Sequence, residues 1–256
     1  MSNSQKFKNE ENQSSIDDEI KTSRILKQQV YMLERYMFVE NQQLEKLIVY
    51  QSNNSIIDLS CQNLTDHDMG IIIQHAVVGK KCKGLNLWGN KFTYESISIL
   101  ADVLDGNKTL RELDLSYNHI SDTGVQMIST ILSSNNCVLQ DIDLSSNDIT
   151  EKGAIYLANM LKKNQTLKAL ALNNNNINDN GLKALVDALA NDNTKLKQLK
   201  LESNRRITRG GIDYIFHSLK DNKNLKEFYV KNCNILDQEL KMLQQKAITF
   251  EFDVFI

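Results

Sequence analysis

A repeat of 28 or 29 residues constrains the fold of this chain more than any other feature. Seven segments carry a triplet in which one residue separates two apolar residues. The second apolar residues of the triplets are Leu59, Leu87, Leu115, Leu144, Leu172, Leu201 and Val230. Successive members are 28, 28, 29, 28, 29 and 29 residues apart. A period of this length predicts an array of similar supersecondary units that bury a continuous core by stacking.

The five units in the middle of the array also have an asparagine three residues after the triplet. This column consists of Asn90, Asn118, Asn147, Asn175 and Asn204. An amide side chain has both donors and acceptors, so it can satisfy backbone groups that a turn leaves unpaired. We therefore expect a structural asparagine ladder that links successive repeats. Gln62 replaces asparagine in the first unit and Cys233 replaces it in the last.

The second half of each unit has the pattern of a helix. Polar residues suited to the N-cap position precede the apolar residues spaced by three and four. These residues are Thr65, Thr93, Ser121, Thr150, Asn178 and Thr208. The triplets themselves alternate with a period of two, which is typical of a strand. Each unit is therefore predicted to be a strand, a turn and a helix.

This pattern resembles the leucine-rich repeat family, and the repeat length is similar to that of its ribonuclease-inhibitor-like subclass. The resemblance covers Ser55 to about Gln245 and implies an α/β solenoid, or horseshoe. Paired strands are about 4.8 Å apart, whereas packed helices need 8–10 Å. The array should therefore curve, with a parallel sheet on the concave face and helices on the convex face.

We expect four parts along the chain. Residues 1–15 are polar and are predicted to be a disordered tail. Residues 16–54 are predicted to be an N-terminal helical cap, or else a coiled-coil arm that recruits a helix partner at residues 16–50. The seven leucine-rich repeats occupy residues 55–245. Residues 246–256 alternate apolar and polar side chains, which favours a last strand that caps the sheet or docks against a partner chain.

Residues next to the triplets are expected to line the concave face and to bind a protein partner. Trp88 and Tyr117 are of the types most often found as interface anchors. The early repeats add Glu112, Asp114, Asp141 and Asp143. The later repeats add Lys200, Tyr229 and Lys231, with Arg205, Arg206 and Arg209 on the adjoining turn. The groove should thus be acidic in the early repeats and basic in the late ones. The alternative is that these aspartates are part of the family consensus and only contact solvent.

A second row of charge directly precedes the triplets. It consists of Lys83, Arg111, Gln140, Lys168, Lys197 and Lys226, in which Gln140 interrupts the cations. These residues follow predicted helix ends, where cations interact favourably with the helix dipole. A phosphate-binding edge is the alternative interpretation.

The remaining features argue against several classes of function. The four histidines and four cysteines have no metal-ligand or disulfide spacing, and no phosphate-binding glycine motif is present. We expect no metal, no cofactor and no catalysis. A net charge of −2 gives no general attraction to nucleic acid, and no apolar run approaches a membrane span. The N-terminal residues lack a signal-peptide pattern, which favours a cytoplasmic location.

The sequence therefore predicts a non-catalytic, intracellular protein-interaction scaffold. Proteins similar to it serve as subunits of cytoskeletal or ciliary assemblies and as effectors that pathogens deliver into host cells. The alternative is a regulator of a small GTPase, because Ran GTPase-activating proteins are built from the same repeat subclass. An enzyme or a nuclease inhibitor is a third hypothesis.

Overall fold

Short strands and helices alternate along the chain in the computed structural model. The structure describes residues 42–134, 138–193, 195–219, 221–236, 238–241, 245 and 253–255. They belong to one compact unit, Gln42–Ile256, and residues 1–41 lie outside the described residues. The predicted tail (1–15) and most of the predicted cap or arm (16–54) therefore lie outside the description.

The strands form one eight-stranded sheet in which every neighbouring pair is parallel and the order follows the sequence. Each strand has three residues, and the first seven strands coincide with the repeated triplets shifted by one residue. The strands are β1 (Ile56–Asp58), β2 (Gly84–Asn86), β3 (Glu112–Asp114), β4 (Asp141–Asp143), β5 (Ala169–Ala171), β6 (Gln198–Lys200), β7 (Glu227–Tyr229) and β8 (Asp253–Phe255).

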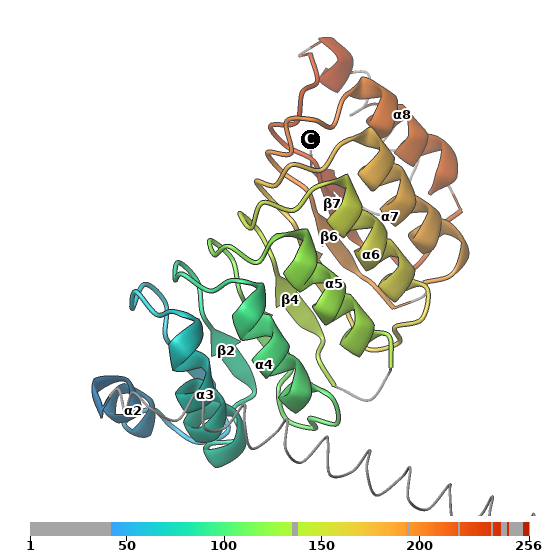
Figure 1. Ribbon diagram of the computed structural model, residues 1–256. Helices are drawn as coiled ribbons and strands as arrows, with labels where there is room; N and C mark the ends of the chain where they lie inside the picture. The colour runs from blue at the N-terminus through green and yellow to red at the C-terminus, as the bar shows by residue number, and fades with distance from the viewer. Residues whose placement is uncertain are drawn as a thin grey trace, which may run out of the picture. The chain divides into compact units, whose positions relative to one another are not determined.

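The helices of successive repeats pack side by side along one face of this sheet (Figure 1). They are the 3-10 helix η1 (Asp66–Asp68), α3 (Met69–Ile72), the π-helix η2 (Ile73–Gly79), α4 (Tyr94–Leu104), α5 (Ser121–Leu132), α6 (Glu151–Leu161), α7 (Asp179–Asn191) and α8 (Arg209–Ser218). One further helix, α2 (Gln42–Val49), precedes the first repeat. The expected α/β leucine-rich repeat solenoid, with a parallel sheet and helices on opposite faces, is confirmed.

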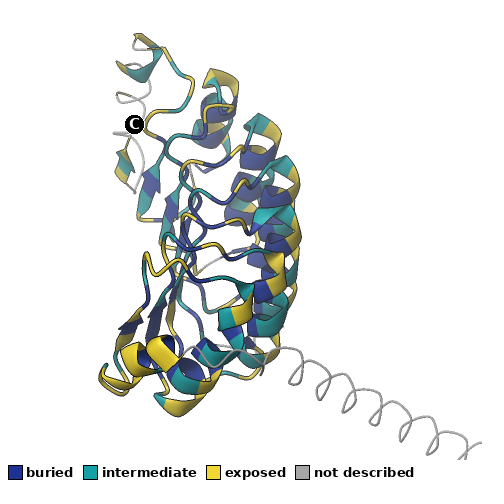
Figure 2. Cartoon of the chain, turned by 60° about the vertical axis from the view of Figure 1, so that its left-hand side comes forward, coloured by how far each residue is buried: buried dark blue, intermediate teal, exposed yellow. Residues whose placement is uncertain are grey.

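The core lies between the sheet and the helices, where buried residues form a continuous layer (Figure 2). In β3 the middle residue Leu113 is buried, whereas Glu112 is exposed and Asp114 is half-buried. Because side chains alternate along a strand, burying the middle residue turns both of its neighbours outward. The outer face of the sheet is therefore lined by the first and third residues of every strand, and we call it the concave face.

Side-chain amides join each repeat to the one before it. The Nδ2 of Asn147 donates to the carbonyl of Leu115 at 2.8 Å and to that of Ser145 at 3.0 Å. Its Oδ1 accepts from the backbone N–H of Ile120 at 3.1 Å. Asn90, Asn118, Asn175 and Asn204 bridge neighbouring repeats in the same way.

The two residues that replace asparagine at the ends of this column behave differently. Cys233 Sγ donates to the carbonyl of Leu201 at 3.5 Å, so it still reaches the preceding repeat. Gln62 is exposed, and its Nε2 donates to the carbonyl of Ser60 in its own repeat.

Helix starts follow the predicted capping residues, with one exception. Thr93, Thr150, Asn178 and Thr208 each accept a hydrogen bond from a backbone N–H in the first turn of their helix. The prediction for Ser121 is wrong, because α5 begins at Ser121 itself. Its backbone N–H donates to the carbonyl of Asn147 at 3.0 Å, and its φ of +58° places it in the left-handed region.

Aspartates in the first turns form a further set of links that sequence analysis missed. Asp122 accepts hydrogen bonds from the backbone N–H and the hydroxyl of Thr150, at 2.8 and 2.6 Å. It also accepts from the N–H of Gly153 at 2.9 Å. Asp66 and Asp179 contact Thr93 and Thr208 of their following repeats in the same way. Each of these aspartates therefore holds the start of the next helix.

A second asparagine column, also missed, lies where the helices end. The Nδ2 groups of Asn164, Asn193 and Asn222 donate to carbonyls near the end of the helix in the preceding repeat, at 2.7, 2.7 and 2.8 Å. Their Oδ1 atoms accept backbone N–H groups of their own turns. The sequence signal was the recurrence of asparagine at a 29-residue interval in the polar tracts that follow the helices.

The two ends of the described array differ. At one end, α2 buries Leu44 and Ile48, and Lys80 Nζ donates to the carbonyls of Val49 and Gln51 at 2.8 and 2.6 Å. At the other end, β8 pairs with β7 and adds an eighth strand to the sheet.

Replacing Asn147 by alanine should lower the free energy of unfolding by about 1–3 kcal/mol, because buried carbonyl and N–H groups would lose their partners. Urea denaturation followed by circular dichroism measures this change. Asn180→Ala is the control, since Asn180 is exposed in the first turn of α7. Equal midpoints for the two variants would contradict the structural role of Asn147.

Candidate functional site

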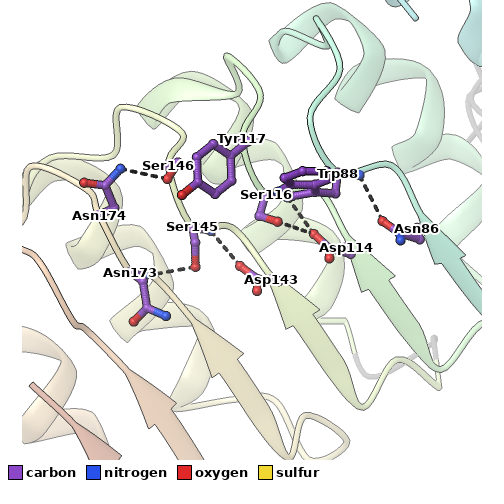
Figure 3. Close-up of a pocket in the computed structure, with 10 residues that line it drawn as sticks. All are labelled: Asn86, Trp88, Asp114, Ser116, Tyr117, Asp143, Ser145, Ser146, Asn173 and Asn174. Atoms are coloured by element: carbon purple, nitrogen blue, oxygen red, sulfur yellow. Dashed lines mark hydrogen bonds between the residues drawn. The ribbon is translucent and has the colours of Figure 1, made fainter. Parts of the chain in front are cut away.

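The concave face brings the predicted aromatic and acidic residues of the early repeats together. Trp88 and Tyr117 follow β2 and β3, and their ring centroids lie 5.8 Å apart with an interplanar angle of 74°. Trp88 is 40% exposed and Tyr117 is 56% exposed. This edge-to-face arrangement is a favoured geometry for aromatic pairs. It holds two large rings at the surface without burying them (Figure 3).

Local hydrogen bonds orient the neighbouring carboxylates. Asp114 Oδ1 accepts from the backbone N–H of Ser116 at 2.8 Å and from its hydroxyl at 2.5 Å. Asp143 Oδ1 accepts from the N–H of Ser145 at 2.8 Å. The repeated Asp-x-Ser pattern therefore fixes these carboxylates at the carboxyl ends of β3 and β4.

The carboxyl groups of β4 are destabilised in their charged form. Burial raises the pKa of Asp143, and nearby Asp114 raises it further, whereas hydrogen bonds from Ser145 and the charge of Lys200 oppose the rise. Burial also raises the pKa of Asp141 and nearby Glu112 raises it further, whereas the charge of Lys168 opposes the rise. A cation placed against these groups would stabilise their charged form.

Two hollows lie side by side on this half of the face. The first has a volume of about 460 Å³ and lies among Trp88, Tyr117, Asp114, Asp143 and Asn173 (Figure 3). Its lining is mostly polar, and serine and asparagine side chains complete it.

The second hollow has a volume of about 400 Å³ and shares Asp114 and Asp143 with the first. Glu112 and Asp141 add two more carboxylates, and Lys200 lies in its lining as well. Ala169 and Ala171 of β5 also line it, where the strands before and after carry larger side chains. Sequence analysis did not assign these alanines to the site, although the small residues of the Ala-Leu-Ala triplet were the available signal.

The late half of the concave face is aromatic and mixed in charge. The Tyr229 ring stacks on Phe255 at 4.2 Å between centroids, and Lys200 Nζ lies 5.5 Å from the Tyr229 centroid. Tyr229 donates its hydroxyl hydrogen to Glu227 at 3.0 Å. Lys231 is exposed. Carboxylates therefore accompany the cations here, so this end is less basic than the sequence suggested.

Arg209 does not belong to the turn that borders this face. It is the first residue of α8 and makes ion pairs with Asp213 at 3.2 Å and Glu239 at 3.1 Å. Its charge is compensated on the helical side, so its predicted contribution to the groove is wrong.

The described residues carry no group of three or more His, Cys, Asp or Glu side chains that could hold a metal ion. Burial raises the pKa of the Cys82 thiol to about 11 and that of Cys233 to about 12, so both stay protonated near neutral pH. Within the part of the chain that the structure describes, no helix has the length and apolar character needed to cross a membrane.

Comparison with known proteins supports the same class. A family model described as "Leucine Rich repeat" matches residues 106–129, 135–158 and 163–186. The mouse (Mus musculus) protein "NACHT, LRR and PYD domains-containing protein 4C" is 33% identical over 149 residues, which is 58% of this chain and 15% of that protein. Pig (Sus scrofa) "Ribonuclease inhibitor" is 29% identical over 210 residues, which is 80% of this chain and 46% of that protein.

A human (Homo sapiens) relative, "NACHT, LRR and PYD domains-containing protein 14", is 29% identical over 204 residues and is covered to 18% of its length. Among solved structures, "Leiomodin-1 Actin-Binding Site 2 (ABS2)" matches with a TM-score of 0.45 and 20% identity. That match covers 59% of this chain and 86% of the solved one.

The chain is therefore a leucine-rich repeat protein, and its repeats are of the ribonuclease-inhibitor-like type. It spans less than half the length of each of these curated relatives.

The raised pKa of Asp143 predicts a pH-dependent effect of Asp143→Asn. In the wild type, the contribution of Asp143 to folding stability should fall as pH rises from about 4 through the raised pKa, because the folded state then carries a penalised charge. The asparagine variant keeps an acceptor for the Ser145 N–H but does not ionise. Its stability relative to the wild type should therefore increase between pH 4 and pH 7, as measured by urea denaturation. A pH-independent difference would contradict this account of Asp143.

Proposed function

We propose that this protein is a non-catalytic scaffold that binds a protein partner on its concave face. The observation that carries the proposal is an exposed aromatic pair, Trp88 and Tyr117, bordering two hollows that share Asp114 and Asp143. Aromatic rings of this kind supply large contact areas at little entropic cost and are enriched among the residues that dominate binding energy.

The partner should present basic side chains to the acidic half. The charged forms of Asp141 and Asp143 are penalised by burial and by neighbouring carboxylates. A lysine or arginine inserted into the second hollow would relieve that penalty, and Ala169 and Ala171 leave space for its stem. Lys200 at the far side of the hollow would then attract a carboxylate of the partner. Together, these two contacts would fix the direction in which the partner lies along the groove.

The curated relatives are consistent with binding rather than chemistry. The pig relative is named for inhibiting a ribonuclease, and the others are named for their domains. We propose that residues 55–245 act as one binding domain in the cytoplasm. Residues 16–54 would be a cap or a helix-binding arm, and residues 246–256 a capping strand. Cytoskeletal or ciliary assemblies and pathogen effectors are the settings that we propose.

Trp88→Ala and Asp114→Lys should each reduce partner capture by the full chain by about tenfold or more, because centrally placed interface residues often contribute 2 kcal/mol or more. Quantitative mass spectrometry of affinity-captured proteins, with each variant beside the wild type, measures this loss. Circular dichroism should show unchanged folding.

Tyr94→Ala and Asp102→Lys are the matched controls. Tyr94 is 44% exposed, which is close to the value for Trp88, and both residues lie on α4 on the opposite face of the sheet. If the concave and control variants captured the same proteins in equal amounts, the concave face would not be the binding site. Stimulation of GTP hydrolysis by Ran would contradict the non-catalytic proposal.

A further inference from the structure

A second charged surface lies where the strands begin, and the concave site does not use it. It consists of Lys83, Arg111, Gln140, Lys168, Lys197 and Lys226, and we call it the basic edge. We propose that the basic edge binds an extended peptide segment rich in aspartate and glutamate. This proposal is independent of what the concave face binds.

Backbone hydrogen bonds stack the residues of the basic edge in register. The N–H of Arg111 donates to the carbonyl of Lys83 at 2.7 Å, and the same bond links each member to the next through Lys226, at 2.6–2.7 Å. The row therefore continues the sheet beyond the first residue of each strand. With a strand spacing of about 4.8 Å, the six positions span about 24 Å. All the cations of the row are exposed.

The charges of this row are not compensated by ion pairs. None of its five cations makes an ion pair within 4.0 Å to another described residue. At longer range, the charge of Lys168 opposes the rise in the pKa of Asp141, so this one cation is partly balanced. Stacked like charges on neighbouring strands repel one another, so an anionic ligand would stabilise the row.

The turns beside the row add to its positive potential. Lys108, Lys163, Lys195 and Lys223 are exposed in the turns that lead into β3, β5, β6 and β7. The described residues of the same turns include only three acidic side chains, Asp105, Asp192 and Asp221. Positive charge is thus concentrated at one edge of a chain whose net charge is −2.

The helix dipole accounts for only part of this arrangement, because its effect is confined to about the last turn of a helix. In sequence, Arg111 follows the end of α4 by seven residues, and Lys168 follows the end of α6 by seven. The turn lysines follow the helix ends more closely, by two to five residues. The residues of the row are instead spaced regularly, one on each successive repeat.

The surroundings favour a narrow carboxylate-rich chain over other polyanions. Glu112, Asp141 and Glu227 border the row on the concave side, so a broad anionic surface would meet repulsion there. The described residues of these turns contain no aromatic side chain on which a nucleic-acid base could stack. Four of the five cations are lysines, which lack the forked geometry that favours phosphate.

The test uses a fluorescein-labelled peptide of alternating Glu and Ser, about ten residues long, which can span the row when extended. Fluorescence anisotropy with the full chain should show binding that weakens as NaCl rises from about 0.05 to about 0.5 M. Lys168→Gln combined with Lys197→Gln should weaken binding about tenfold, since each exposed ion pair contributes modestly. Gln140 shows that glutamine fits at this backbone position.

Two further variants sharpen the result. Gln140→Lys completes the row and should strengthen binding severalfold. Lys91→Gln combined with Lys152→Gln removes two exposed charges beyond the other end of the strands and should leave binding unchanged. Equal affinities for the edge pair and this control pair would overturn the proposal. Tighter binding of single-stranded DNA or phosphatidylserine vesicles than of the peptide, with the same sensitivity to Lys168 and Lys197, would also overturn it.

Discussion

The structure depends on one interaction, a side-chain amide that bridges two neighbouring repeats. Three-residue strands offer few backbone hydrogen bonds, and the turns after them would leave buried carbonyl and N–H groups unpaired. Asn118 and Asn147 satisfy such groups in their own repeat and in the preceding one. Each unsatisfied buried group costs about 1–3 kcal/mol, so a column of these amides has a large effect on whether the array forms at all.

The amides also decide where the functional side chains lie. These amides hold successive repeats in the same register. Equivalent residues of successive repeats therefore lie side by side in columns on the outer face of the sheet. One column carries Asp114, Asp143 and Lys200, and the column before the strands carries the basic edge. A repeat that varies at these positions therefore changes the surface without changing the core.

Much of this could be predicted from the sequence because a repeat reports the same position many times. The triplet period predicted a stacked array of similar units, and the resemblance to the leucine-rich repeat family implied the parallel sheet and the solenoid. The acidic residues were identified because alternation in a strand fixes which side chains point outward, and Trp88 and Tyr117 because they lie just after a triplet. The structure was needed to show the distances between these residues, the two hollows and the role of the alanines of β5. The depth of a hollow depends on side chains from several repeats, which a repeat pattern does not give.

Other features were missed because they depend on contacts between repeats rather than on local pattern. Ser121 looks like its equivalents in the other repeats. Its backbone, however, has a left-handed conformation, and its N–H donates to the carbonyl of Asn147. Asp122 looks like a favourable charge in a first turn, yet its main partners belong to the next helix. Arg209 was expected on the turn beside the groove, but it is the first residue of α8 and pairs with Asp213 and Glu239. In each case, a hydrogen-bond or ion-pair partner that determines the residue's position is about 26 to 30 residues away in the sequence.

Hydrogen exchange measured residue by residue with NMR tests the central role of the amide ladder most directly. The backbone N–H groups of Phe92, Ile120 and Ile177 lie outside helices and strands and donate only to asparagine Oδ1 atoms of the next repeat. If the ladder holds the repeats together, these amides should exchange as slowly as those of the central strands. Exchange at the rate of an unstructured peptide, with the strand amides still protected, would contradict it.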